Sequence, residues 1–367
     1  MIHSLVMTAT LAGALLAAAD NTQVLEERYA SGEVKLKREV RRDSQGQLVN
    51  HGKLETWYKG GKQASQYVYR NGQRDGPWTE WYETGVKKAE GTYVAGERDG
   101  TETHWSPKEE KLQETNYVKG QKHGLATEWY PSGGKRSESN FDLGKFHGRV
   151  MQWYGDGAQR SIEEFDHGVR HGAEVRFNRS GHKVLDAHYD QGKKDGPYAE
   201  AYSDGKPRTE RTYKADVPDG KYREWNPDGS VKVEGELHEG KRHGVWTEWW
   251  TLADDHRTAF RGEYKEGVSH GAFTNWFKNG EKRTEYHFVD GNRQGTCTQW
   301  FDNGQKQSEA TFENDVPNGR VIDWFRSGAP KSLYEFRLGK NHGLFVEWNE
   351  AGEVVSQQQF VDGKPVR

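Results

Sequence analysis

The chain has little of what holds most globular proteins together. Only 32% of its 367 residues are hydrophobic, it contains 10 prolines, and Cys297 is its single cysteine, which excludes an intramolecular disulfide. Lysine and arginine (53) do not outnumber aspartate and glutamate (56), which argues against nucleic acid or an anionic membrane as the partner. No long apolar run follows the first 20 residues, so we expect no integral membrane segment after removal of a leader.

Glycine and aromatic residues are abundant instead, with 44 glycines and 12% aromatics. One glycine recurs as a marker, every 24 residues from Gly52 to Gly244, then after 27 residues at Gly271, and again every 24 to Gly343. This gives thirteen copies of one unit. A fixed period of this length is the signature of a repeat architecture and overrides the two or three domains that the length suggests.

Each repeat carries two aromatic anchors, numbered here from the marker glycine as position 0. Position 5 is a tryptophan or phenylalanine except at Ala201, and position 17 is a tyrosine or phenylalanine except at Leu237. Turn dipeptides such as Asp156-Gly157 and Asn303-Gly304 lie between the anchors, and glycine recurs too often for a helix. We therefore predict an all-β fold, an elongated single-layer antiparallel β-meander or solenoid of about thirteen 24-residue β-hairpin repeats.

Side-chain alternation leads to a further expectation about the two faces of this sheet. Acidic residues recur at positions 4 and 14, and basic residues recur at position 12. These positions have the opposite parity to the rings at positions 5 and 17, so we expect all the rings on one face and the charges on the other. Cys297 shares position 2 with Trp78 and Trp246, so we expect it to be a small, at least half-buried apolar residue.

The ends of the chain differ from the repeats. Residues 1–19 are apolar and alanine-rich, with no charge before Asp20 and a small-residue site that ends at Ala19, which is typical of a signal peptide. Residues 20–47 are interpreted as a degenerate N-terminal capping repeat, and residues 48–367 as the repeat array. A leader of this kind predicts a secreted or periplasmic protein.

The repeated pattern G-x-W-x-E-W-Y-x-x-G-x-x-x-x-E-x-x-Y-x-x-G-x-x-x-G resembles the MORN repeat, and specifically the bacterial variant of YwqK-type proteins. The resemblance covers roughly residues 52–363. It implies stacked β-hairpins and a role in protein–protein association. Some members of the family are labelled as antitoxins of toxin–antitoxin pairs, and MORN repeats have been proposed to contact membrane lipids.

The ring that follows position 5 is the best candidate for an interaction surface. It should face away from the tryptophan and is replaced by asparagine in some repeats, as an exposed position can be. The candidate residues are Tyr58, Tyr82, Tyr130, Tyr154, Tyr202, Phe277, Phe301 and Phe325. Such rings suit a protein partner, and they also suit cell-wall glycan.

Histidine precedes the marker glycine seven times, as in His123, His147 and His171. Neighbouring repeats would hold these rings about 10 Å apart, too far for shared ligation of one metal ion. Aspartate, asparagine and glutamine occupy the same position elsewhere, as a turn requires. We therefore assign no metal, cofactor or catalytic residues, and the charged residues are interpreted as surface ion pairs.

The sequence thus predicts an exported, non-enzymatic repeat protein that acts as an extended scaffold for an unidentified protein partner. Binding to glycan or cell wall through the exposed aromatic rings is the alternative, and neutralisation of a toxin is a further one. The three-residue insertion between Trp249 and His256 is open to interpretation as either a tolerated loop or a functional one.

Overall fold

A computed structural model describes residues 22–251 and 256–366, and β-strands are the regular secondary structure of this part. The predicted all-β class is therefore confirmed. The described residues fall into two compact units, one of residues 22–147 with 155–157 and one of residues 148–154 with 158–366. No helix among the described residues is long and apolar enough to cross a membrane. The expected leader, residues 1–19, lies outside the described part.

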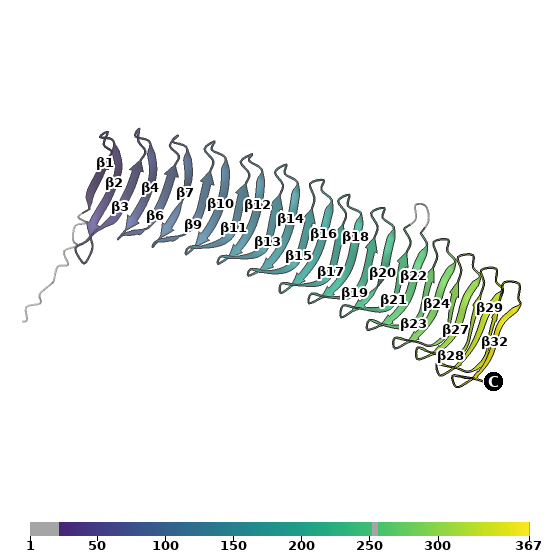
Figure 1. Cartoon of the computed structure of the whole chain (residues 1–367). Coiled ribbons are helices and arrows are strands. Elements are labelled where there is room, and N and C mark those ends of the chain that lie inside the picture. Colours follow the sequence, from purple (N-terminus) through teal and green to yellow (C-terminus); the bar gives the residue numbers. More distant parts are fainter. Residues whose placement is uncertain (1–21, 252–255, 367) are drawn as a thin grey trace, which may run out of the picture. The chain divides into compact units, whose positions relative to one another are not determined.

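The first unit is a single-layer antiparallel meander in which strands that follow one another in the chain pair with each other (Figure 1). Residues 20–47, predicted to form a degenerate cap, contribute the hairpin of β1 and β2, and β2 pairs with β3. The strands are β1 (Gln23–Arg28), β2 (Val34–Arg42), β3 (Leu48–Trp57), β4 (Gln63–Arg70), β5 (Gln73–Arg74), β6 (Gly76–Trp81), β7 (Lys87–Val94), β8 (Glu97–Arg98), β9 (Gly100–Trp105), β10 (Lys111–Val118), β11 (Gln121–Trp129) and β12 (Lys135–Asp142).

The second unit repeats the same antiparallel pairing and contains β13 (Lys145–Trp153) from Gly148 onward. Its other strands are β14 (Gln159–Asp166), β15 (Val169–Phe177), β16 (Lys183–Asp190), β17 (Lys193–Ala201), β18 (Pro207–Lys214), β19 (Val217–Trp225), β20 (Val231–His238), β21 (Lys241–Trp249), β22 (Thr258–Lys265), β23 (Val268–Trp276), β24 (Lys282–Val289), β25 (Asn292–Arg293), β26 (Gly295–Trp300), β27 (Lys306–Glu313), β28 (Val316–Trp324), β29 (Pro330–Arg337), β30 (Lys340–Asn341), β31 (Gly343–Trp348), β32 (Val354–Val361) and β33 (Lys364–Pro365).

Two kinds of turn alternate along the chain. A three-residue loop follows position 6, as where the Tyr82 amide bonds the Val86 carbonyl oxygen at 2.8 Å and Gly85 adopts a φ of 91°. A two-residue turn closes the repeat, and both of its central residues have positive φ, 52° at Asn71 and 86° at Gly72. This second turn has the twist that favours tight antiparallel hairpins. The glycine spacing therefore follows from the turn geometry.

Pairing within each hairpin shows that the expected division of the faces is wrong. Gly76 (position 0) lies opposite Tyr93 (position 17), and Trp78 (position 2) lies opposite Gly91 (position 15). Side chains at even positions of the first strand therefore point to the same face as side chains at odd positions of the second strand. Positions 2, 4, 13, 15 and 17 consequently share one face, which we call the ring face. The tryptophans at position 5 lie on the opposite face, and the acidic residues at position 4 share the ring face with the rings of position 17.

The ring face holds most of the buried apolar side chains. Trp78, Val150, Trp246, Phe273 and Cys297, all at position 2, are between 3% and 7% exposed. This confirms the expected burial of Cys297. Rings at positions 2 and 17 contact one another between strands. The Phe273 ring meets those of Tyr264 and Phe288 edge-on, with centroids 5.2 Å and 4.9 Å away. Tryptophans at position 5 are half-buried, and lysines of position 11 lie over several of them, as Lys282 does over Trp300 at 5.7 Å.

Charged side chains form short ion pairs on both faces. Basic residues at position 12 meet acidic residues at position 4 in Lys88–Glu80 (3.2 Å), Arg136–Glu128 (3.7 Å), Arg208–Glu200 (3.9 Å) and Lys232–Glu224 (3.5 Å). Lysines at position 11 meet acids at position 14 of the same strand, as in Lys87–Glu90 (2.7 Å) and Lys183–Asp186 (2.7 Å). Such exposed pairs each contribute less than about 1 kcal/mol.

The marker glycine has a positive φ, and in some repeats a neighbouring carboxylate also approaches it too closely for a side chain to fit. At Gly343 a Cβ atom would lie 2.0 Å from the Glu335 carboxylate, which accepts hydrogen bonds from the Leu344 amide (3.0 Å) and from Arg320 Nε (3.1 Å). The hydrogen bond from the Leu344 amide is the main cause that lowers the pKa of Glu335, and the Arg320 guanidinium lowers it further. Glu164 repeats the arrangement over Gly172, with the Ala173 amide and Arg149 as its partners.

Replacement of Glu109 by glycine should stabilise the first unit. Glu109 takes the loop position that Gly85 takes in the preceding repeat, with a φ of 66°. A side chain in this conformation costs about 1–2 kcal/mol, so we expect Glu109→Gly to raise the free energy of unfolding by about 1 kcal/mol. Urea unfolding followed by circular dichroism measures the change. Lys108→Gly, one residue earlier and without a positive φ, is the control and should be destabilising; equal effects of the two changes would contradict the explanation.

The Glu335 carboxylate should make its repeat more stable at neutral than at acidic pH. Because its pKa is lower in the folded protein than in the unfolded chain, its contribution is present above the unfolded pKa and is lost as the pH falls through the folded pKa. We expect the protection of the Leu344 amide against hydrogen exchange, corrected for intrinsic rates, to decrease below about pH 4. In Glu335→Gln this protection should be lower at pH 7 and should lose most of its dependence on pH. Unchanged pH dependence in the variant would contradict this role.

Candidate functional site

The eight rings of the expected interaction surface lie at position 6 and are all half-buried. Four of the tyrosines donate their hydroxyl to the backbone carbonyl of position 5 in the next repeat. These bonds are Tyr58 to Trp81 (2.8 Å), Tyr82 to Trp105 (2.8 Å), Tyr154 to Phe177 (3.0 Å) and Tyr202 to Trp225 (2.8 Å). These hydroxyls therefore connect successive repeats.

Cations lie over several rings of the same row in the second unit. The guanidinium of Arg283 is 5.8 Å from the Phe277 ring centroid, that of Arg326 is 5.8 Å from that of Phe301, and the Lys331 ammonium is 5.9 Å from that of Phe325. Two guanidinium groups, of Arg160 (5.9 Å) and Arg179 (5.5 Å), lie over Tyr154. The row is thus a band of rings and cations, with much of its ring area already in contact.

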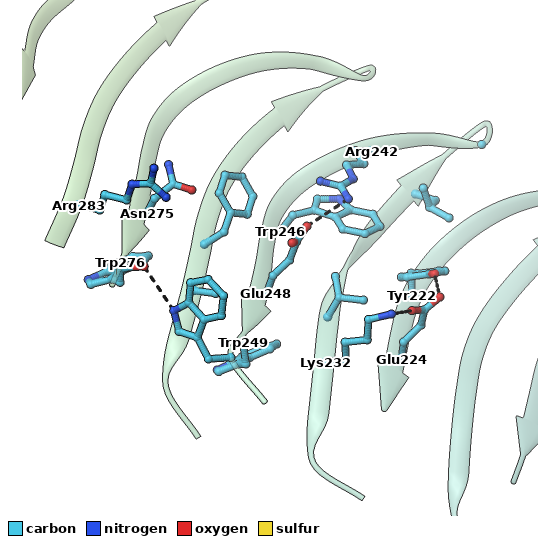
Figure 2. Close-up of a pocket in the computed structure, with 16 residues that line it drawn as sticks. Tyr222, Glu224, Lys232, Arg242, Trp246, Glu248, Trp249, Asn275, Trp276 and Arg283 are labelled. Carbon is cyan, nitrogen blue, oxygen red and sulfur yellow. Dashed lines mark hydrogen bonds and ion pairs between the residues drawn. The ribbon is translucent and has the colours of Figure 1, made fainter. Parts of the chain in front are cut away.

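A groove of about 750 Å³ interrupts the regular surface of the second unit, between β19 and β24 (Figure 2). It is lined by Trp249 and Trp250, which precede residues 252–255, and these four residues lie outside the described part. Its aromatic lining consists of Tyr222, Trp246, Trp249, Trp250, Phe260 and Trp276. Trp246 and Trp250 contribute indoles to the groove, whereas Trp249 and Trp276 occupy position 5, whose side chains belong to the opposite face, and border the groove at the ends of their strands. Sequence reasoning did not predict the groove.

The wall of the groove is fixed by Trp246, which is 3% exposed. Gly235 makes room for it, because a Cβ atom there would lie 2.4 Å from the indole. The indole N–H donates to the Glu236 carbonyl oxygen at 2.9 Å, and the ring lies between Tyr222 (centroids 5.3 Å apart) and the Arg242 guanidinium (4.3 Å). Leu237 occupies position 17, where other repeats hold a ring, and it also lines the groove. The smaller side chain leaves this part of the ring face less filled.

The charged groups of the groove are mostly paired. Lys232 Nζ lies 3.5 Å from Glu224, and Arg242 lies 3.3 Å from Glu248. Burial and the hydrogen bond that Tyr222 donates to the Glu224 carboxylate raise the pKa of this tyrosine to about 12, so its hydroxyl remains protonated at neutral pH. Arg283 is exposed at the same groove, beside Asn275.

Trp250 takes the place of the position-6 tyrosine at the edge of the groove. Its indole N–H donates to the Trp276 carbonyl oxygen at 3.3 Å, which repeats the bond that the tyrosines make elsewhere. Beside it, Trp249 stacks on His256 with centroids 5.3 Å apart and planes 15° apart. The repeat with the insertion therefore keeps the link to its neighbour while it exposes a larger ring system.

The histidines before the marker glycine serve the closing turn. The side chain at this position accepts a hydrogen bond from the backbone amide of position 19. His342 Nδ1 accepts from Asp362 (3.4 Å), Asp99 from Lys119 (3.2 Å) and Asn318 from Leu338 (3.2 Å). A shared acceptor role explains the interchange of residue types. It supports the turn interpretation of these histidines over metal ligation.

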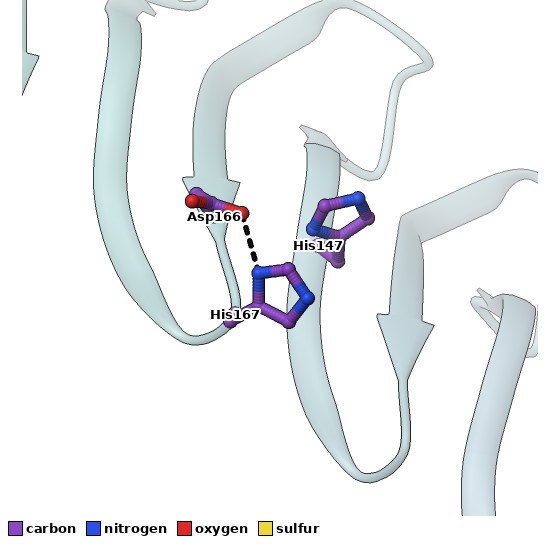
Figure 3. A group of neighbouring side chains, drawn as sticks. All are labelled: His147, Asp166 and His167. Carbon is purple, nitrogen blue, oxygen red and sulfur yellow. Dashed lines mark hydrogen bonds and ion pairs between the residues drawn. The ribbon is translucent and has the colours of Figure 1, made fainter.

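One histidine in a closing turn of the second unit also contacts a carboxylate. Figure 3 shows Asp166 and His167, whose Nδ1 lies 2.6 Å from the carboxylate. The third side chain drawn, His147, belongs to the first unit. A pair of adjacent residues supplies too few ligands for a structural metal site, which normally takes four.

Sequence reasoning missed the cations at position −2, two residues before the marker glycine. They lie over the ring of position 17 in Arg98–Tyr117 (5.3 Å), Lys122–Phe141 (5.0 Å), Arg170–Tyr189 (5.5 Å), Arg242–Tyr264 (5.4 Å) and Arg293–Phe312 (4.0 Å). The recurrence of lysine or arginine at position −2 is the feature of the sequence from which these cation–ring contacts could have been predicted. These contacts cover one side of the core rings with a charged but amphipathic side chain.

Loss of one position-6 hydroxyl should weaken the fold. Tyr202→Phe removes the hydrogen bond to the Trp225 carbonyl and leaves that half-buried acceptor without it, so we expect a loss of about 1 kcal/mol. Urea unfolding measures the change, and hydrogen exchange should place it in the adjoining repeats. The control is Phe301→Leu in a repeat that lacks the hydroxyl, which should leave exchange around Trp225 unchanged. Full stability of Tyr202→Phe would show that the hydroxyl has another role.

Comparison with known proteins places three segments in one family. Residues 74–95, 122–142 and 293–314 match the model described as "MORN repeat variant". All three begin two residues before a marker glycine, at Gly76, Gly124 and Gly295, so the family repeat and the structural repeat have the same phase. No curated protein matches the chain.

Solved structures give weak similarities. Crystal structures of TcdB2-TccC3, TcdB2-TccC3-Cdc42 and TcdB2-TccC3-TEV match with 10%, 9% and 12% identity and TM-scores of 0.17, 0.14 and 0.16. The alignments cover 92%, 91% and 93% of this chain but 22%, 21% and 18% of those chains, so the chain spans about a fifth of their length. Scores this low carry no argument about fold or function. Three in-phase matches to the family model, together with hairpins of the same period, support a MORN-repeat protein.

Proposed function

We propose that the chain is an exported MORN-repeat protein of the YwqK type that acts without catalysis as a protein-interaction scaffold. The observation that carries the proposal is the groove of the second unit, which six aromatic residues and paired charges line. Rigid aromatic side chains with arginine beside them are the residues that supply most binding energy at protein interfaces. We accordingly propose this groove as the binding site of the scaffold.

The groove chemistry favours recognition over catalysis. Its two carboxylates, Glu224 and Glu248, each lie within ion-pair distance of a cation, and the Tyr222 hydroxyl stays protonated at neutral pH. General acid–base catalysis needs a group with a pKa near the working pH. Fixed ion pairs around aromatic rings instead hold the side chains of the groove in place for a partner.

Glycan binding is the second candidate, because indoles also stack on sugar rings and this groove concentrates them. Toxin neutralisation is a special case of the leading proposal, in which the protein partner is a toxin. Both candidates place the ligand in the groove rather than along the position-6 row, whose tyrosine hydroxyls are engaged within the fold.

Site-specific photocrosslinking tests the proposal. A benzophenone amino acid at Lys232, an exposed residue of the groove, should crosslink the intact protein to a discrete protein partner in extracts of the native cell envelope. The same probe at Arg261, exposed on the opposite face, is the matched control and should give no such adduct. Adducts restricted to glycan, or identical patterns from the two positions, would contradict the proposal. Mass spectrometry of the adducts and of the mature N-terminus identifies the partner and tests export.

A further inference from the structure

Arg283 is the one cation of the groove that lacks a carboxylate partner among residues 22–251 and 256–366. It occupies position 12, where four other repeats pair the cation with an acidic residue at position 4. In its own repeat that acid is replaced by Asn275. The repeat therefore keeps the cation of a recurrent ion pair and has lost its internal anion.

The geometry brings this cation to the aromatic surface. Asn275 lies opposite Thr284, the neighbour of Arg283, across the ladder of β23 and β24. The Asn275 side chain donates from Nδ2 to the Thr284 hydroxyl at 2.8 Å, and its Oδ1 takes no part in this hydrogen bond. Figure 2 shows Arg283 and Asn275 at the end of the groove where Trp276 also lies. A ligand there would meet a guanidinium and indoles together.

The charge of the groove is complementary to an anion. Three cations, Lys232, Arg242 and Arg283, face two carboxylates, Glu224 and Glu248, so the groove carries one positive charge in excess in a chain of net charge −3. The fork of one guanidinium matches one carboxylate. A phosphate group, with nearly two charges, is normally held by a cluster of arginines. The excess charge thus fits a single carboxylate.

We propose that the groove recognises an acidic segment of a partner protein, in which one aspartate or glutamate pairs with Arg283 and neighbouring apolar side chains contact Trp250 and Phe260. This rests on the proposed function and names the chemistry of its partner. A peptide is favoured over an acidic glycan because the other charged groups of the groove are already paired. A sugar ring presents several hydroxyls that would need free polar partners, whereas this segment needs one cation and apolar contact area.

Two variants of the full-length protein test the role of the charge. Arg283→Gln removes the cation, and Asn275→Glu keeps it but restores the internal ion pair that other repeats contain. Arg160→Gln is the matched control, because Arg160 also occupies position 12, lies 5.9 Å from the Tyr154 ring, and has Gln152 rather than an acid at position 4. Arg160 lies outside the groove.

The probe is an array of random nonapeptides, to which each labelled protein is applied at low and high salt. We expect the wild type to select peptides with one acidic residue flanked by apolar ones, and both groove variants to bind the selected peptides about tenfold more weakly. Arg160→Gln should bind like the wild type. Unfolding curves of the four proteins show that Asn275→Glu is folded.

Each other outcome counts against the inference in a distinguishable way. Selection of apolar peptides without an acidic preference, or equal binding by Arg283→Gln, overturns the role of the carboxylate and leaves the interaction scaffold intact. Binding to soluble polygalacturonate but to no peptide assigns the groove to acidic glycan. Binding to neither probe, together with no protein adduct in the crosslinking experiment, removes the proposed function as well.

Discussion

Contact between rings across the ring face is the interaction on which the structure depends. A lone hairpin exposes both of its faces, and only 32% of this chain is hydrophobic, so burial must come from the neighbouring repeat. The column of Tyr264, Phe273 and Phe288 shows how this works, because the central ring contacts one ring on each side. Each repeat is thus incomplete alone, and stability is shared between nearest neighbours.

Position 2 of the ring face can hold a buried carboxylate where a cation lies next to it. Position 2 holds Glu102 in the first unit and Glu174 in the second, and both side chains are buried. Arg98 lies 3.1 Å from Glu102, and Arg170 lies 3.5 Å from Glu174. These arginines occupy position −2 and also lie over the position-17 rings of Tyr117 and Tyr189. A buried carboxylate is costly unless it is paired, so the cation at position −2 is what allows an acid to replace an aromatic ring.

Much of the fold could be predicted from the sequence, because turns and periodicity are local properties. The spacing of the marker glycines gave the hairpins, and Cys297 was correctly placed by the residues that share its position. The faces were assigned wrongly because odd and even positions were assumed to keep the same faces on both strands of a hairpin. In the structure the odd positions of the two strands, such as those of Trp81 and Tyr93, point to opposite faces. The groove could not be predicted, because it combines Leu237, Trp250 and Asn275 from three successive repeats. The three departures from the consensus were visible, but their proximity was not.

An array of identical repeats would offer the same surface at every repeat, so it could not bind one partner at one place only. Specificity must then arise where the repeat changes. In the second unit several changes coincide: a smaller side chain at Leu237, a larger ring at Trp250, and an amide in place of an acid at Asn275. The first opens space, the second adds apolar surface, and the third leaves a cation without its internal anion. Regular repeats on either side supply the rigid support that such a site requires.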